Sequence, residues 1–287
     1  MSDATGESDI LSPDGGAEAD QELSLQDRLA AAIRANRPAA TVTIVTGPRS
    51  GTKLLVLVPT PGVPEERVER FGTLGVDALD EEAAHHAAKQ LAAERSARIS
   101  LASGSAGTID VFVEVFPQPP TLLIFGAVHV GQALCTLAKQ LGYWVVVTDA
   151  RGALATQERF PEADRIIRGW PDDALAQVPI TTTTDIAILT HDPKFDEPAI
   201  VGSLATPARY IGAIGSRSTN EDRRRRLAGA GVSEADVARV HGPIGLNIGA
   251  ESPEEMAVAI MAEIIATRRG RPGGSLKSAT GRIRNEG

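Results

Sequence analysis

The segment from Thr121 to Asp149 constrains the fold more than any other part of this 287-residue chain. An apolar run from Leu122 to Phe125 has the length of a buried strand, and a glycine-containing turn follows it. Apolar residues then recur at helical spacing until a second strand-like run, Trp144 to Thr148, ends on Asp149. A strand, a glycine turn, a helix, a strand and an acid in this order are typical of the opening unit of a doubly wound dinucleotide-binding fold.

The glycine turn departs from the G-x-G-x-x-G pattern of that fold at its middle position. Gly126 and Gly131 occupy the outer positions, whereas Val128 stands where a glycine normally lets the backbone approach a pyrophosphate. A β-branched side chain is expected to crowd a phosphate and to resist a positive φ. His129 is expected to pack against the first helical turn or to cap it. Asp149 lies about 20 residues beyond the turn, where this fold has a ribose-binding carboxylate.

Composition narrows the classes of function. The net charge of −8 argues against general nucleic-acid binding, and an aromatic content of 3% argues against base-stacking surfaces. A single cysteine leaves no disulfide framework and no cysteine-based zinc site, and no metal site is expected. No apolar run is long enough to span a membrane and no secretory signal pattern is present, so the expected location is the cytoplasm.

The predicted fold class is α/β, with two domains separated by a proline-rich connector. Three prolines within residues 117–120 favour an extended, stiff segment there. We expect a C-terminal Rossmann-like parallel sheet with helices on both faces and a smaller N-terminal α+β domain. The expected parts are an acidic disordered tail, the N-terminal domain, the connector, the Rossmann-like domain and a second disordered tail, at residues 1–22, 23–116, 117–120, 121–270 and 271–287.

Alternating helix and strand patterns fill the N-terminal domain. Ser24 is expected to cap a first helix, and residues Leu79 to Arg95 are expected to form a second. Strands are expected at Thr41 to Thr46, Leu54 to Val58 and Ile109 to Phe116. The turn between the first two strands carries Arg49 and Lys53. Two interpretations of this turn stay open: an anion-binding hairpin loop, or an ordinary turn with solvated cations.

In the Rossmann-like domain, strands alternate with helices, which predicts a parallel sheet whose ligands bind outside the carboxyl ends of the strands. Strands are expected at Arg165 to Arg168, Asp185 to Leu189 and Tyr210 to Ile214. The last two are followed by His191 and by Gly215, Ser216 and Arg217. His191 is a candidate ligand contact because it lies at a strand end. Arg217 is a candidate phosphate contact because a guanidinium beside a helix start suits an anion.

Several residues near these strand ends have a structural interpretation. Asp192 before Pro193 has the pattern of a helix N-cap. Ser218 with Glu221 fits a capping box. Residues Arg223 to Arg226 are expected to form a solvated helix face.

The last organised segment runs from Gly242 to Ser252 and is rich in glycine. Its irregular backbone can approach a ligand closely. It carries three further candidate ligand contacts, Gly245, Asn247 and Gly249. Ser252, Pro253 and Glu255 then specify the start of a helix through an N-cap, a proline at the first helical position and a capping box.

Four separated motifs occur in an order that matches a known family. They are Phe125 to Leu134, Leu189 to Asp192, Tyr210 to Arg217 and Gly242 to Glu255. In these motifs the chain resembles the xanthine dehydrogenase accessory (XdhC/CoxI) family, and the resemblance covers about residues Thr41 to Gly270. It is weaker in the N-terminal half, where the match is Gly47 to Lys53.

The resemblance implies a non-catalytic maturation factor that binds molybdenum cofactor transiently, as molybdopterin or its dinucleotide form. It further implies that the factor helps the cofactor to acquire its sulfido ligand. The factor would then deliver the cofactor to the apoenzyme of a molybdenum hydroxylase of the xanthine or carbon monoxide dehydrogenase type. A sulfur-donating desulfurase is another implied partner, and symmetry base rates allow a homodimer. Helix N-termini and glycine loops suit the phosphate of such a cofactor. The candidate cofactor-binding residues are Gly126, Val128, His129, Gly131, Asp149, His191, Gly215, Ser216, Arg217, Gly245, Asn247, Gly249, Arg49 and Lys53.

The chain departs from the family pattern at two places where the family has a cysteine. Residues 72–78 and 105–108 contain none, and the only thiol is Cys135 in the helix after the glycine turn. Cys135 is expected to be a small buried residue. Together with Val128, these differences indicate a divergent member of the family.

Two alternative functions stay open. The opening βαβ unit and Asp149 are compatible with an NAD(P)-dependent oxidoreductase of unknown substrate. Val128 and the lack of a proton-donor constellation nevertheless make NAD(P) an unexpected ligand. The third interpretation is a degenerate, non-binding partner protein that forms a complex but holds no small molecule.

Overall fold

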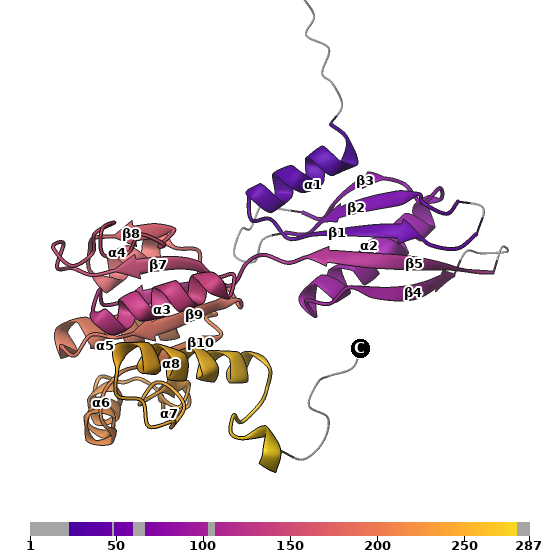
Figure 1. Ribbon diagram of the computed structural model, residues 1–287. Coiled ribbons are helices and arrows are strands. Elements are labelled where there is room, and N and C mark those ends of the chain that lie inside the picture. The colour runs from indigo at the N-terminus through magenta and orange to yellow at the C-terminus, as the bar shows by residue number, and fades with distance from the viewer. Residues whose placement is uncertain (1–22, 48, 60–66, 103–106, 280–287) are drawn as a thin grey trace, which may run out of the picture.

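The computed structural model describes residues 23–47, 49–59, 67–102 and 107–279. It contains an antiparallel sheet from the N-terminal part of the chain and a parallel sheet from the C-terminal part (Figure 1). The predicted α/β class, with a Rossmann-like parallel sheet and a smaller N-terminal α+β part, is therefore confirmed. The acidic tail predicted at residues 1–22 lies outside the described residues, as do residues 280–287 of the second predicted tail.

The N-terminal sheet has the strand order β3-β2-β1-β5-β4, and its neighbouring strands are antiparallel. Its elements are β1 (Ala39–Ile44), β2 (Lys53–Leu57), β3 (Glu69–Gly72), β4 (Ala97–Ala102), β5 (Thr108–Phe116), α1 (Leu25–Arg34) and α2 (Asp77–Ala92). The two helices cover opposite faces because side chains alternate along each strand. Leu54 and Val56 of β2 pack in the cluster with α2, whereas Leu55 and Leu57 pack in the cluster with α1.

The predicted helices and strands of this region are present, with ends that differ by up to three residues. Ser24 caps α1 as predicted, because its hydroxyl accepts a hydrogen bond from the Asp27 amide at 3.1 Å. The sequence patterns did not predict β3 and β4. In β3, Glu69 and Arg70 are both exposed, so the strand lacks the apolar alternation that identifies a half-buried strand.

The C-terminal sheet has the strand order β11-β10-β9-β6-β7-β8, and its neighbouring strands are parallel. Its strands are β6 (Thr121–Phe125), β7 (Trp144–Thr148), β8 (Arg165–Ile167), β9 (Thr184–Ile188), β10 (Tyr210–Ala213) and β11 (Val240–His241). Counted from β6 as the first strand, this is the order of the doubly wound dinucleotide-binding fold. The chain enters this sheet from β5 through residues 117–120, where the sequence predicts the connector.

Helices cover both faces of the parallel sheet, as predicted (Figure 1). One face packs against α3 (His129–Gln140) and α8 (Pro253–Arg268), and the other against α4 (Pro171–Gln177), α5 (Pro193–Leu204), α6 (Arg217–Gly229) and α7 (Glu234–Val237). Ser252 and Glu255 form the predicted capping box at the start of α8. Beyond α8 the chain forms a short 3-10 helix, Leu276–Ser278. Among the helices that the structure describes, none is both long enough and apolar enough to cross a membrane.

Gly131 lets α3 begin close to the turn that precedes it, and replacing this residue tests that packing. A Cβ atom on Gly131 would lie 2.8 Å from the Gly126 carbonyl oxygen. We expect Gly131→Ala to lower the free energy of unfolding in urea by about 1–3 kcal/mol, because the backbone must move to relieve the contact. Gly229→Ala is the matched control, since a Cβ atom there meets nothing within 4 Å. Equal losses in the two variants would contradict this account of the turn.

Candidate functional site

The carboxyl ends of the parallel strands form the edge of the sheet at which ligands of this fold bind. We define the rim as the segments that follow β6, β7, β8, β9 and β10, together with residues 242–252. The chain order reverses between β6 and β9, and such a reversal marks the crevice where ligands of this fold lie. The candidate residues of the C-terminal half, from Gly126 to Gly249, all lie on the rim.

The turn after β6 passes very close to the end of β9. A Cβ atom on Gly126, whose φ is +108°, would lie 2.9 Å from Cγ2 of Thr190, so only glycine allows this approach. Val128 has extended backbone with φ −93° and ψ 174°. The turn therefore requires no positive φ at this position, and a β-branched residue fits it without backbone strain. His129 begins α3 and is exposed, and Val128 rather than His129 occupies the N-cap position.

Asp149 holds the turn after β6 in place. Its buried carboxylate accepts hydrogen bonds from the Ala127 amide at 2.8 Å and from the Arg151 amide at 2.8 Å. The Arg151 guanidinium donates to the same carboxylate at 3.0 and 2.9 Å. Burial raises the pKa of Asp149, but these hydrogen bonds outweigh it and leave the pKa below its usual value. The carboxylate that the sequence assigns to ribose binding is thus already engaged by donors of the protein.

A cleft of about 390 Å³ opens between the start of α6, the segment 242–252 and α8. It brings together five of the candidate residues, Gly215, Arg217, Gly245, Asn247 and Gly249. The residue that caps α6 is Ser216, whose hydroxyl accepts from the Thr219 amide at 3.1 Å. The predicted capping box of Ser218 and Glu221 was wrong, because α6 begins at Arg217 and its cap lies two residues earlier than predicted.

The glycine-rich segment is held against α8 by Glu263, a residue that the sequence patterns did not single out. The Glu263 carboxylate accepts hydrogen bonds from the Gly245 amide at 2.8 Å and from the Tyr210 hydroxyl. It also lies 3.4 Å from Nδ1 of His241. Burial raises the pKa of Glu263, and the hydrogen bonds with His241, Tyr210 and Gly245 bring it below its usual value. The shape of the cleft wall therefore depends on one carboxylate of α8.

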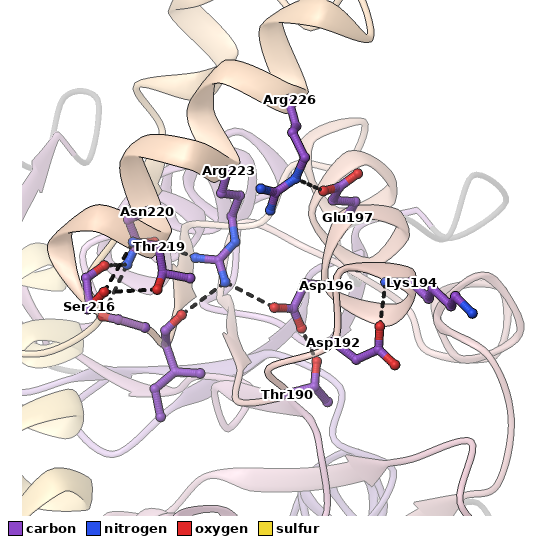
Figure 2. Close-up of polar contacts among 12 residues, drawn as sticks. Thr190, Asp192, Lys194, Asp196, Glu197, Ser216, Thr219, Asn220, Arg223 and Arg226 are labelled. Carbon is purple, nitrogen blue, oxygen red and sulfur yellow. Dashed lines mark hydrogen bonds and ion pairs between the residues drawn. The ribbon is translucent and has the colours of Figure 1, made fainter.

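A buried ion pair joins the ends of β9 and β10 (Figure 2). Arg223 of α6 donates to Asp196 of α5 at 3.0 Å and to the Ile214 carbonyl at 3.0 Å. Both charged side chains are almost fully buried, with 4% exposed. Asp196 also accepts from the Thr190 hydroxyl. The expectation that residues Arg223 to Arg226 form a solvated face was wrong for Arg223, because this side chain turns inward to neutralise Asp196.

The same network reaches three glycine-containing segments of the rim, those with Gly126, Gly215 and Gly242. Asn220 accepts from Arg223 and donates to the carbonyls of Gly215 and Ser216 at 3.2 and 3.0 Å (Figure 2). A Cβ atom on Gly242 would lie 2.3 Å from Oδ1 of Asn220. Thr190, at the other end of the network, contacts Gly126. The network therefore links the turn after β6 to the start of α6 and to the segment 242–252.

Arg49 and Lys53 do not join the rim. Arg49 lies in the β1–β2 turn and Lys53 begins β2, and the pairing of Ala39 with Phe116 puts that turn at the end of the N-terminal sheet farthest from the connector (Figure 1). Arg49 donates to the Leu74 carbonyl at 3.2 Å. The rim lies at the end of β6 that is also farthest from the connector. The candidate residues thus fall into two groups in different parts of the molecule.

The structure also places three other residues that the sequence singled out, His191, Asp192 and Cys135. His191 is exposed on the rim just after β9, and Asp192 caps α5 as predicted by accepting from the Lys194 amide at 3.0 Å. Cys135 is buried as predicted, with 1% of its surface exposed. Within the four described stretches of chain, no group of three or more His, Cys, Asp or Glu side chains could hold a metal ion.

The strand order, the glycine turn and the rim define an α/β domain of the dinucleotide-binding type. Residues 122–264 match the family model described as the XdhC Rossmann domain. The chain therefore belongs to the XdhC family, and the resemblance found in its sequence motifs is confirmed.

Similar proteins support this assignment. A Bacillus subtilis protein described as a probable xanthine dehydrogenase subunit is 34% identical over 162 residues, which are 56% of this chain and 47% of that protein. Uncharacterized protein YqeB of Escherichia coli is 30% identical over 180 residues, which are 63% of this chain and 33% of that protein. The chain thus spans about half the length of the first relative and about a third of the second.

Two further similarities concern a chaperone and a solved structure. Molybdenum cofactor insertion chaperone PaoD of E. coli is 26% identical over 147 residues, which are 51% of this chain and 40% of that protein. A crystal structure described as a xanthine dehydrogenase from Bacillus halodurans superposes with a TM-score of 0.50 and 20% identity, covering 88% of this chain and 97% of that one. At this identity the structural likeness supports the fold alone.

Breaking the buried pair tests its role in the rim. We expect Arg223→Met to lower the free energy of unfolding by about 3–5 kcal/mol, because it leaves Asp196 buried without its partner. Arg225→Met on the same helix is the matched control, since that side chain is 78% exposed. The free energy of unfolding of this control variant should fall by no more than about 1 kcal/mol. Urea unfolding followed by circular dichroism measures both, and a loss below that of the control would contradict the role assigned to Arg223.

The lowered pKa of Asp149 predicts a pH-dependent contribution to stability. The contribution is fully present above the pKa of an unfolded-state aspartate, about 3.9, and is lost as the pH falls through the lower pKa of the folded state. We expect Asp149→Ala to have a lower free energy of unfolding than wild type at pH 7. Below pH 4 this difference should become progressively smaller. A difference between wild type and variant that is the same at pH 7 and pH 3 would contradict this prediction.

Proposed function

We propose that this chain is an accessory factor that binds the molybdenum cofactor at the rim and assists its insertion into a molybdenum hydroxylase of the xanthine dehydrogenase type. The observation that carries the proposal is the cleft of about 390 Å³ in which five candidate residues meet. The match to the XdhC Rossmann domain and the similarity to a molybdenum cofactor insertion chaperone support it.

The chemistry of the cleft suits a phosphate-bearing ligand. The amides of Arg217 and Ser218 at the start of α6 have no acceptor among the described residues, as expected for the first residues of a helix. The exposed Arg217 guanidinium likewise has no ion-pair partner within the described part of the chain. Gly245 and Gly249 have φ values of +99° and +74°, so side chains do not shield the backbone there. Free amides, a guanidinium and bare backbone together favour an anion.

The chain is suited to binding the cofactor but not to transferring sulfur to it. Cys135 is its only thiol, and burial, followed by the charges of Glu162 and Asp164, raises the pKa of that thiol to about 11. A thiolate is the form that accepts or passes sulfur, so Cys135 is unsuited to that role near neutral pH. The proposal is therefore limited to binding and delivery, with a separate sulfur-donating desulfurase as the source of any sulfido ligand.

A nicotinamide-dependent oxidoreductase is the second candidate, because the strand order is that of NAD-binding domains. The engaged carboxylate of Asp149 argues against it, since the Arg151 and Ala127 donors already occupy both oxygens. Calorimetric titration with NAD(H) and NADP(H) distinguishes the two. Micromolar binding of either nucleotide would favour the oxidoreductase.

The proposed function is tested by co-expressing the chain with a molybdenum hydroxylase and measuring the cofactor that co-purifies. We expect native mass spectrometry to detect the cofactor on wild-type protein and hydroxylase activity to fall when the gene is deleted. Arg217→Ala should weaken cofactor binding about tenfold, the effect of losing one charge-assisted hydrogen bond. Arg225→Ala, an exposed arginine on the same helix, should leave binding unchanged. A protein that takes up no cofactor, with a hydroxylase that stays fully active after deletion, refutes the proposal.

A further inference from the structure

Two aromatic side chains stack on one another at the rim. Trp170 lies at the N-terminus of α4, and Phe195 lies in the first turn of α5. Their ring centroids are 4.6 Å apart and the ring planes are inclined by 26°. Trp170 is 52% exposed although it is one of only two tryptophans in the chain. The low aromatic content argued against a stacking surface, yet the fold brings together two side chains that lie 25 positions apart in sequence.

The stacked pair borders the most constrained part of the rim. Phe195 lines a hollow together with Gly126, Thr148, Asp149 and Thr190. Gly169 and Pro171, the two chain neighbours of Trp170, line it too. The hollow has a volume of about 10 Å³, which is room for about one water-sized group. The indole thus lies beside the crevice at which the order of the strands reverses.

One residue that lines this hollow, Thr148, carries a hydroxyl that is unpaired in the described part of the chain. Oγ1 of Thr148 is buried, with 1% of the residue exposed, and it has no hydrogen-bond partner among the described residues. Buried hydroxyls are nearly always paired, so an exception at a residue that lines this hollow is compatible with a polar partner from outside the chain, either an ordered water or a ligand atom. This observation is independent of the aromatic pair, and both concern the same place.

Packing alone accounts for Phe195 but not for the position of Trp170. Phe195 is half-buried between α4 and α5, where it fills space. Trp170 leaves half of its surface in water, although an indole is the side chain that gains most from burial. Its free surface beside a ligand crevice has the character of a stacking platform, because every planar heteroaromatic ring presents a π-face to it.

We propose that Trp170, backed by Phe195, is the stacking platform for the planar heteroaromatic ring of the ligand, either a pterin or a nucleobase. The identity of the ring rests on the proposed function, whereas the platform itself does not. Trp170 follows β8, and from the end of β8 to the end of β10 the sheet takes four strand-to-strand steps, about 19 Å. A ligand that stacks on Trp170 and reaches the cleft at Arg217 is therefore elongated, with its ring and its phosphate at opposite ends.

The two tryptophans make the chain suitable for a direct test. Trp144 begins β7, so it lies at the edge of the sheet opposite the rim. Trp144→Phe therefore leaves Trp170 as the sole tryptophan, and Trp170→Phe leaves Trp144 as the matched control. The probes are neopterin, GMP and CMP as planar rings, and ribose 5-phosphate as a phosphate without a ring. Tryptophan fluorescence and calorimetric titration are the readouts.

We expect at least one ring probe to quench the emission of Trp144→Phe in a saturable manner and to leave the emission of Trp170→Phe unchanged. In the calorimeter, Trp170→Ala should weaken that probe at least tenfold, and Trp170→Phe should restore most of the affinity. Binding of ribose 5-phosphate should be the same in all variants. Circular dichroism verifies that Trp170→Ala is folded. If that variant does not fold, the comparison of Trp144→Phe with Trp170→Phe by fluorescence still tests the platform.

Each remaining outcome is decisive. Saturable binding of neopterin identifies a pterin ring, and saturable binding of GMP or CMP identifies a nucleobase. If no ring probe binds the wild-type protein at millimolar concentration, or if Trp170→Ala binds as tightly as wild type, the platform is refuted. A platform that binds rings in a protein that acquires no molybdenum cofactor would refute the proposed function and leave this inference standing.

Discussion

The ion pair between Asp196 and Arg223 is the interaction through which the separate segments of the rim come to share one arrangement. Both side chains are almost fully buried, so water cannot substitute for either partner. Thr190 and Asn220 extend the pair toward the turn at Gly126 and toward the start of α6. Replacing a buried ion pair by apolar side chains is often neutral for stability. We therefore interpret this pair as a device that fixes geometry at the rim rather than as a large source of stability.

Three buried or half-buried carboxylates divide the task of holding the rim. Asp149 binds the turn after β6, Asp196 binds the end of β9, and Glu263 binds the segment that contains Gly245. Asp149 faces Arg151 and Asp196 faces Arg223, so these two negative charges are compensated where they lie, and Glu263 is stabilised by hydrogen bonds from Tyr210 and Gly245. Compensation of this kind allows an anion to approach free amides and a guanidinium nearby, since uncompensated carboxylates would repel it.

The N-terminal sheet and the rim contribute different surfaces. The β1–β2 turn with Arg49 lies at one end of the antiparallel sheet, and the rim lies at the far end of the parallel one. Arg49 fits closely over Gly75, where a Cβ atom would lie 1.7 Å from its Nη1 atom. The φ of +108° favours glycine at position 75, and the absence of a side chain there leaves room for the guanidinium.

The sequence determined the local elements and the class of fold, because these depend on short-range patterns. The spacing of apolar residues identified β6, α3 and β7, and the caps at Ser24, Asp192 and Ser252 could be read from single residues and their neighbours. Tertiary structure alone decided which polar groups are buried and which segments meet. Arg223 looks like a solvated residue in its arginine-rich helix, and only the packing of α6 beside α5 turns it toward Asp196. Trp170 joins Phe195 for the same reason: long-range contacts are set by how whole elements pack, which no local spacing records.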